Sequence, residues 1–397
     1  MTTINIEQLL GSMVEKEASD LYLTVDSSPV YRINGINTTT QQTPFTQNDT
    51  NNLALSIIDD SQKKEFEEQK ELNIALYIPS LGRFRVNLMR QRGVVALVIR
   101  RIKTDIPSIE ELALPTILKE IVLQKQGLVL VVGATGSGKS TTIASMIDHR
   151  NSTSSGHIIT IEDPIEFVHA HKQSIVSQRE IGIDTNSAES ALKNCLRQSP
   201  DVVLLGEIRT AEMMDAAIAF AETGHLCLAT LHSNNTNQTM ERILNFFPPA
   251  RHRQIYLQLS LSLRAIIGQR LIHTHDGKRI PAVELLRDSP RIKDLIHKGQ
   301  ITELKEAIEK GENIGMQTFD QSLLRLYQNG DISLDEALLN ADSPNNLRLK
   351  IKLASDGATF SEQLNRGAFA KVSSSASSES VLRLSKQGQN GEEDKKD

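Results

Sequence analysis

The residues best suited to chemistry are three glycines, a lysine and a serine within a run of eight. The run Gly133-Ala-Thr-Gly-Ser-Gly138-Lys139-Ser140 fits the spacing G-x-x-x-x-G-K-[ST] and follows the apolar run Leu128–Val132. Glycines let successive backbone N–H groups turn toward phosphate oxygens, and a helix that follows presents its positive end to them. We expect Lys139 to reach the β- and γ-phosphates of ATP and Ser140 to ligate Mg²⁺. The predicted cofactor-binding residues are Gly133, Ala134, Thr135, Gly136, Ser137, Gly138, Lys139, Ser140 and Thr141.

A carboxylate near the metal is the second requirement, and Asp201-Val-Val-Leu-Leu-Gly-Glu207 offers two. Ligands of a parallel sheet bind outside the carboxyl ends of its strands. Asp201 lies at the amino end of this apolar run, so it is about 20 Å from Glu207 at about 3.3 Å per residue. We therefore predict Glu207 as the metal-side acid, together with Ser140, and a turn-closing role for Asp201 after Pro200.

Two glutamates follow the apolar run His157–Ile161 at the same predicted edge. Hydrolysis needs a carboxylate that orients or deprotonates water in line with the γ-phosphate. Glu162 and Glu166 are both candidates for this role, and the residues alone leave the choice open.

Two histidines flank the apolar run Leu226–Thr230. His232 follows the run and is expected beside the phosphates. His225 precedes it, at the far end of the strand, where spacing alone makes it an ordinary capping residue.

Six arginines fall within nineteen residues of the N-terminal part. Arginine is always charged, and its planar guanidinium group can donate two hydrogen bonds to phosphate oxygens. It can therefore stabilise charge that develops during phosphoryl transfer. For most of the six we expect a solvated strand face. Arg85 and Arg100 occur in separate strand-like runs that bracket one turn, so they could point together, toward their own nucleotide or a neighbour's. The six are Arg83, Arg85, Arg90, Arg92, Arg100 and Arg101.

The hydrophobic pattern divides the chain into regions. Residues 1–103 read as a small α+β module, with helical spacing, alternating strand-like runs and turn residues, and residues 104–118 read as a linker. Residues 119–285 alternate helical segments with short, continuous apolar runs, as parallel strands covered on both faces require, which predicts a doubly wound α/β domain. Residues 286–345 read as helical, and residues 346–397 as a tail that is disordered from about residue 370.

Composition excludes several classes of protein. The 397 residues carry 44 Lys and Arg against 49 Asp and Glu, only 4% aromatic residues and no Trp. This balance is unfavourable for bulk nucleic-acid binding. Two cysteines cannot build a disulfide framework or a four-cysteine zinc site. We find no targeting segment and no run near the ~20 apolar residues of a membrane helix, so we expect no direct membrane insertion.

Taken together, the motifs resemble the type II/IV secretion ATPase superfamily and, most closely, the PilT/PilU retraction ATPases of type IV pili. The similarity runs from about Glu15 to Leu339. It includes the nucleotide loop, the Asp box at 161–169, the Walker B segment at 201–209, the His box at 223–232 and the segment 315–323.

The resemblance implies a PAS-like N-terminal domain, a RecA-like ATPase domain and a homohexameric ring. It also implies catalytic roles: Glu166 activates water, Glu207 is the Walker B acid, Arg85 and Arg100 are arginine fingers, and His225 and His232 are the His-box pair.

The implied function is a motor ATPase that powers pilus retraction and twitching motility. Ala134 replaces a usual proline, and Arg291–Lys298 keeps the apolar spacing of a PilT motif but changes its polar residues. These departures and the long tail make the chain more similar to the accessory PilU type. The implied partners are a PilT-type ATPase and an inner-membrane platform protein, with a cytoplasmic position at that membrane.

Three other functions are considered. An assembly or type II secretion ATPase generally carries a four-cysteine zinc insertion, which two cysteines cannot supply. The acidic balance argues against a RecA-like nucleic-acid translocase. A nucleotide-binding scaffold without turnover is disfavoured because Lys139, Ser140, Glu166 and Glu207 occur together.

Overall fold

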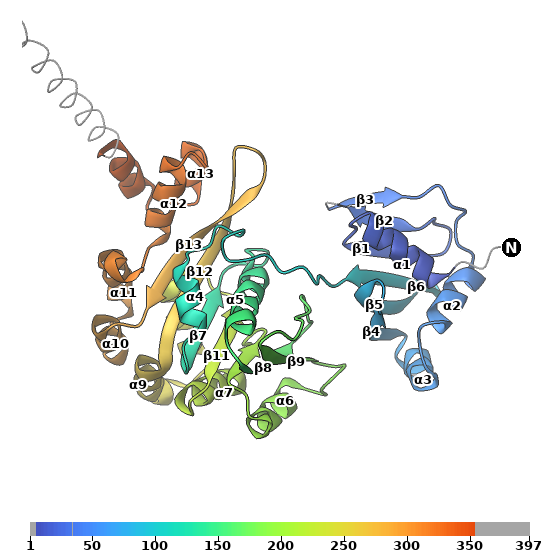
Figure 1. Cartoon of the computed structure of the whole chain (residues 1–397), viewed down its shortest axis with the longest axis horizontal. Coiled ribbons are helices and arrows are strands. Elements are labelled where there is room, and N and C mark those ends of the chain that lie inside the picture. The colour runs from blue at the N-terminus through green and yellow to red at the C-terminus, as the bar shows by residue number, and fades with distance from the viewer. Residues whose placement is uncertain (1–4, 34, 354–397) are drawn as a thin grey trace, which may run out of the picture. The chain divides into compact units, whose positions relative to one another are not determined.

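A computed structural model describes residues 5–33 and 35–353 of the chain (Figure 1). It divides the chain into two compact units, Met1–Asn340 and Ala341–Asp397. Of the second unit, residues 344–353 are helical, within the region where a tail was predicted. The predicted disorder from about residue 370 lies outside the described residues.

The N-terminal module is built on a six-stranded sheet in the order β3-β2-β1-β6-β5-β4, and the pairs are antiparallel. Its inward-facing residues and three helices form one core, which includes Leu10, Tyr31, Phe84 and Ile99. The predicted α+β character is confirmed. The strands are β1 (Asp20–Leu23), β2 (Val30–Ile33), β3 (Ile36–Thr39), β4 (Glu71–Ile78), β5 (Gly82–Gln91) and β6 (Val94–Arg101), and the helices α1 (Ile6–Glu15), α2 (Gln47–Leu55) and α3 (Asp60–Gln69).

The ATPase region contains a seven-stranded sheet in the order β13-β12-β7-β11-β10-β8-β9. All its neighbouring strands are parallel except the pair β12–β13, which is antiparallel. The four apolar runs predicted as parallel strands are all parallel, and a hairpin at one edge of the sheet brings β13 back along β12. The strands are β7 (Gly127–Val132), β8 (Gly156–Glu162), β9 (Ser174–Glu180), β10 (Val202–Leu205), β11 (Leu226–Leu231), β12 (Leu263–His273) and β13 (Arg279–Arg287).

Both faces of this sheet are buried, as the continuous apolar runs predict. Side chains alternate along a strand, so Leu128 and Leu130 of β7 face one core while Val129 and Val131 face the other. The first core packs against α6, α7, α8, α9, α10 and α11, and the second against α4 and α5. The helices are α4 (Ile117–Val122), α5 (Lys139–Thr153), α6 (Ala188–Cys195), α7 (Ala211–Glu222), α8 (Thr236–Asn245), α9 (His252–Ser262), α10 (Pro290–His297) and α11 (Leu304–Lys310).

The predicted linker and the segment after residue 285 both pack against the ATPase core, which the sequence did not predict. Ile109 and Leu114, within the predicted linker, are buried in the core beside α4 and α5. Strand β13 continues to Arg287, and the backbone of Gln317 exchanges two hydrogen bonds with Leu285. The predicted C-terminal helices are present, ending with α12 (Phe319–Gln328) and α13 (Leu334–Leu339).

The remaining features of the fold are the cap of the helix α13 and four short 3₁₀ turns. Ser333 caps α13 by accepting a hydrogen bond from the backbone N–H of Glu336, and the Glu336 carboxylate accepts one from the Asn340 side chain. The 3₁₀ turns are η1 (Leu196–Gln198), η2 (Pro249–Arg251), η3 (Ile301–Glu303) and η4 (Glu312–Ile314).

Candidate active site

The glycine-rich loop joins the end of β7 to the start of α5, as predicted. Gly138 is the N-cap of α5 with φ 88°, a left-handed conformation that suits glycine. A β-carbon on Gly133 would lie 2.4 Å from the Ser137 hydroxyl oxygen, so no larger residue fits there without displacing the loop. The Ser137 hydroxyl is buried and has no hydrogen-bond partner within residues 5–33 and 35–353. A loop of this shape, with an unpaired buried donor, fits a bound phosphate group.

Lys139 is buried at the base of this loop. Its ammonium group donates to the carbonyl oxygens of Gly133, at 2.9 Å, and Ala134, at 3.0 Å. Burial lowers the pKa of Lys139, and the negative charges of Glu207 and Glu166 oppose that shift. The lysine is therefore under the electrostatic influence of both predicted carboxylates.

A cavity of about 270 Å³ brings Glu166, Glu207 and His232, three of the six predicted catalytic residues, together with Lys139 and Ser140. Strands β8, β10 and β11 end side by side, so the residues that follow them reach one edge of the sheet. The lining includes both candidate acids of the Asp box, the Walker B acid and one His-box histidine. Its chemically active residues are Lys139, Ser140, Glu162, Asp163, Glu166, His169, Glu207, Arg209 and His232.

Glu207 is held by cationic or imidazole groups on both of its oxygens. Arg209 donates from Nε to one oxygen at 2.8 Å, and His232 Nε2 lies 3.0 Å from the other. Arg209 also donates to the Asp163 carboxylate at 3.0 Å. The guanidinium therefore joins the loop after β8 to the loop after β10.

The two open candidates for the water-orienting acid have different surroundings. Glu162 accepts hydrogen bonds from Thr160 at 2.7 Å and from Gln178 at 3.2 Å, and burial raises its pKa. Glu166 is exposed and lines the same cavity. Glu162 is thus anchored in the protein, whereas the Glu166 carboxylate faces the space where a nucleotide would bind.

Asp201 and His225 lie at the amino ends of their strands, away from this cavity. Asp201 accepts a hydrogen bond from the backbone of His157 at 2.8 Å, in the turn-closing role that was predicted. His225 Nδ1 lies 3.1 Å from the Thr223 hydroxyl and 3.2 Å from the Phe220 carbonyl at the end of α7. Within one chain His225 is a capping residue, and its catalytic role remains a prediction from the resemblance.

Arg85 and Arg100 are direct cross-strand partners in β5 and β6, so the prediction that they point together has a structural basis. Arg100 also forms an ion pair with the nearly buried Asp20, at 2.8 Å. Neither arginine lines the 270 Å³ cavity or the second cavity beside the glycine-rich loop, which is described next. Their role as arginine fingers remains a prediction.

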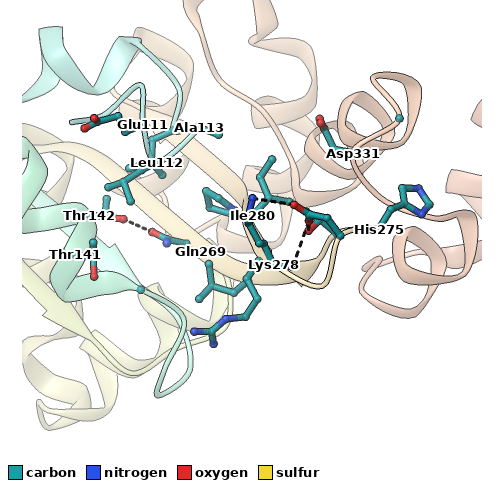
Figure 2. Close-up of a pocket in the computed structure, with 18 residues that line it drawn as sticks. Glu111, Leu112, Ala113, Thr141, Thr142, Gln269, His275, Lys278, Ile280 and Asp331 are labelled. Carbon is teal, nitrogen blue, oxygen red and sulfur yellow. Dashed lines mark hydrogen bonds and ion pairs between the residues drawn. The ribbon is translucent and has the colours of Figure 1, made fainter. Parts of the chain in front are cut away.

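A second cavity, of about 560 Å³, adjoins the loop on its other side (Figure 2). Gly138, Thr141 and Thr142 form one wall, and the hairpin of β12 and β13 forms another. Figure 2 shows Gln269 reaching from β12 toward Thr142. Apolar side chains contribute to the lining, which suits a flat, weakly polar group attached to a phosphate; they are Leu112, Leu114, Leu271, Ile280 and Pro281.

The site residues that the sequence analysis did not single out include Arg209 and Gln269. A signal existed for each of them. Arg209 comes two residues after the predicted metal-side acid. Gln269 is an amide inside the apolar run 265–272, and a buried amide requires hydrogen-bond partners.

The oxygen ligands at the loop fit Mg²⁺, which is bound in proteins by one or two carboxylates together with substrate phosphates. Ser140 offers a hydroxyl and Glu207 a carboxylate at the same cavity. Among the described residues, no helix has the length and apolar character needed to cross a membrane.

The chain matches the family described as "Type II/IV secretion system protein" over residues 2–325. It is 51% identical over 354 residues to the type IV pilus ATPase PilU of Pseudomonas aeruginosa, covering 89% of this chain and 93% of that protein. It is 38% identical over 343 residues to the type IV pilus retraction ATPase PilT of the same organism, covering 86% of this chain and all of that protein (100%).

Among solved structures, the fold is similar to that of the pilus retraction motor PilT crystallised with bound ADP. The TM-score is 0.81 at 40% sequence identity, and the match covers 87% of this chain and 99% of that one. The similarity therefore extends through the N-terminal module and the ATPase core together.

Proposed function

The chain belongs to the type II/IV secretion system protein family, in its PilT/PilU group of pilus ATPases, and from this premise we propose that it powers type IV pilus retraction as a PilU-type motor. It is an ATPase of RecA-like fold with a PAS-like N-terminal domain. The observation that carries the proposal is the convergence of Lys139, Ser140, Glu166 and Glu207 on one cavity.

In the proposed mechanism the loop residues 133–141 bind the phosphates of ATP through their backbone N–H groups, and Lys139 neutralises the terminal phosphates. Ser140 and Glu207 would hold Mg²⁺, which supplies charge neutralisation during phosphoryl transfer. Glu166 orients the attacking water, because its carboxylate is exposed to the cavity. Glu162 supports the loop that carries Glu166, because its oxygen is already occupied by Thr160 and Gln178.

The second cavity takes the base and ribose of the same nucleotide. It begins at Gly138 and Thr141, directly beside the residues that bind the phosphates. The Leu112 and Leu114 side chains on one wall and Ile280 on the other offer apolar contact to the faces of a base.

The active assembly is a homohexamer in which Arg85 and Arg100 stabilise the charge that develops on the phosphates. The chain works in the cytoplasm at the inner membrane, docked on a pilus platform protein beside a PilT-type ATPase. The similarity to PilU and PilT supports this assignment, as do Arg85 and Arg100, which are paired on one sheet face.

Two experiments test the function. Lys139→Ala should abolish phosphate release by the purified full-length chain, and retained turnover would refute the catalytic assignment. Cells without the protein should be imaged with and without a PilT-type partner. Excess surface pili would support retraction, whereas bald cells would identify an assembly ATPase instead.

A further inference from the structure

Gln269 of β12 touches both ends of the glycine-rich loop, although it is remote from the loop in sequence. Strand β12 runs parallel to β7 with Gly268 opposite Val132, so the next residue of each strand brings Gln269 beside Gly133. A β-carbon on Gly133 would lie 2.6 Å from the Gln269 carbonyl oxygen. A β-carbon on Gly138 would lie 2.7 Å from the Gln269 side-chain nitrogen. The first and last glycines of the loop therefore both pack against this one residue.

The side chain of Gln269 also bonds to the helix that follows the loop. The Thr142 hydroxyl donates a hydrogen bond to the side-chain amide oxygen of Gln269 at 2.6 Å. Both residues are almost fully buried, with 1% exposure for Thr142 and 3% for Gln269. Figure 2 shows this bond as a dashed line between the two side chains. A buried hydrogen bond between fixed strands and the first turn of α5 restricts the conformations that the loop can adopt.

We propose that Gln269 is a positioning residue that holds the phosphate-binding loop in its binding shape through Thr142. The inference rests on the proposed nucleotide site and deepens it. A loop that is already in its binding conformation loses less freedom when the ligand arrives. Without the bond, only a fraction of molecules would have a competent loop, and the apparent affinity would fall by that fraction.

Inorganic pyrophosphate separates this role from a contact with the base. Binding of Mg²⁺-pyrophosphate and Mg²⁺-ADP to the full chain should be measured by calorimetry at a temperature where every variant is folded. Thr142→Val and Gln269→Met should each weaken both ligands by the same factor, about 3- to 10-fold, as expected for one buried hydrogen bond. The double variant should be no weaker than either single one, because both changes remove the same bond.

Two further variants control for effects on folding. Thr142→Ser retains a hydroxyl and should recover most of the affinity lost in Thr142→Val. Gln317 is another buried glutamine of this region, whose amide donates to the Val283 carbonyl at 2.7 Å, and it lines neither cavity. Gln317→Met should lower stability but leave both affinities unchanged.

Three results would overturn the inference: loss of ADP affinity alone, unchanged affinity in both loop variants, or an equal loss in Gln317→Met. The first would mean that Gln269 contacts the base. Failure of the unaltered chain to bind either ligand would instead refute the proposed nucleotide site, so the two failures are distinguishable.

Discussion

Glu162 and Glu166 lie four residues apart and share one cavity, yet their environments separate their roles. The Glu162 carboxylate is surrounded by protein, which raises its pKa because burial disfavours the charged form. One oxygen of this carboxylate, Oε1, also accepts hydrogen bonds from Thr160 and Gln178. Glu166 keeps an exposed carboxylate, which is the state that a water-orienting group needs.

Replacing each acid by its amide tests this difference. Glu166→Gln should reduce kcat by about 10²- to 10⁴-fold, the usual range for loss of a general base. Glu162→Gln should reduce it by less than about tenfold, because glutamine keeps the oxygen that accepts from Thr160 and Gln178. Steady-state phosphate release measures both. An equal loss in the two variants would contradict the assignment.

His169 is a buried histidine whose Nδ1 has no hydrogen-bond partner among the residues that the structure describes. Burial lowers its pKa to about 4 from the ordinary 6.5, so the folded chain keeps it neutral at pH 7. Between these two values the unfolded chain binds more protons than the folded chain, and stability therefore falls as the pH falls.

This residue should make the fold acid-sensitive. Between pH 7 and pH 5 we expect it to lower the free energy of unfolding by about 2 kcal/mol, because its pKa differs between the two states. His169→Phe has a ring but no titratable group, so its free energy of unfolding should fall by about 2 kcal/mol less over the same pH range. Urea unfolding of both proteins at the two pH values measures it. An identical pH dependence in the variant would show that other groups are responsible.

At the scale of elements, the four central strands are the part that sequence predicts best. Short, continuous apolar runs are typical of strands buried on both faces, and β7, β8, β10 and β11 agree with the prediction to within about one residue. Because the ends of these strands could be located, so could Lys139, Glu166, Glu207 and His232.

The remaining elements lack such a signal. Strand β9 pairs only with β8 at the sheet edge, and its sequence Ser-Ile-Val-Ser-Gln-Arg-Glu has few apolar residues. Strand β3 is exposed at all four positions. The bridging role of Arg209 and the position of Gln269 depend on which strands are neighbours, and that order cannot be read from local periodicity.

The pairing of β5 with β6 leads to a prediction for Arg85. This half-buried arginine lies opposite Arg100 in the register of the two strands, and a guanidinium group can bind phosphate oxygens. Arg85→Ala should abolish hydrolysis while ADP binding is kept, because the phosphate loop and both cavities are unchanged. Fluorescent ADP titration and phosphate release measure the two properties.

Arg90 provides the matched control on the same strand. It is exposed and donates to the Gly93 carbonyl at 3.3 Å in the β5–β6 turn. Arg90→Ala should keep both turnover and binding. If Arg85→Ala loses ADP binding instead, Arg85 is a ligand of the ground-state nucleotide, and the finger role is wrong.

At the scale of the whole molecule, the residues that line the two cavities all come from positions 111–331, whereas the paired arginines belong to the N-terminal sheet. The proposed arginine fingers would therefore have to be brought to the nucleotide cavity, and assembly into a ring is the proposed means. Activity should then depend on protein concentration, since dissociated chains lack the complete site.

Light scattering with Mg²⁺ and ATP should report a particle six times the 44.0 kDa of one chain. ATPase activity per chain should rise with protein concentration over the range where this particle forms. The Glu166→Gln variant should bind ATP without hydrolysing it, so the nucleotide would stay intact during the light-scattering measurement. A monomer with full activity per chain would contradict the ring.

The second cavity has a consequence for the synthesis of the protein, because its lining extends from Glu111 to Asp331. A ribosome translating the message makes the glycine-rich loop long before it makes the hairpin and the last wall of the pocket. Nascent chains, and fragments released early, would carry the phosphate loop without a closed pocket for the base. Such products should bind nucleotide poorly, and truncated chains would therefore compete little with finished ones for ATP.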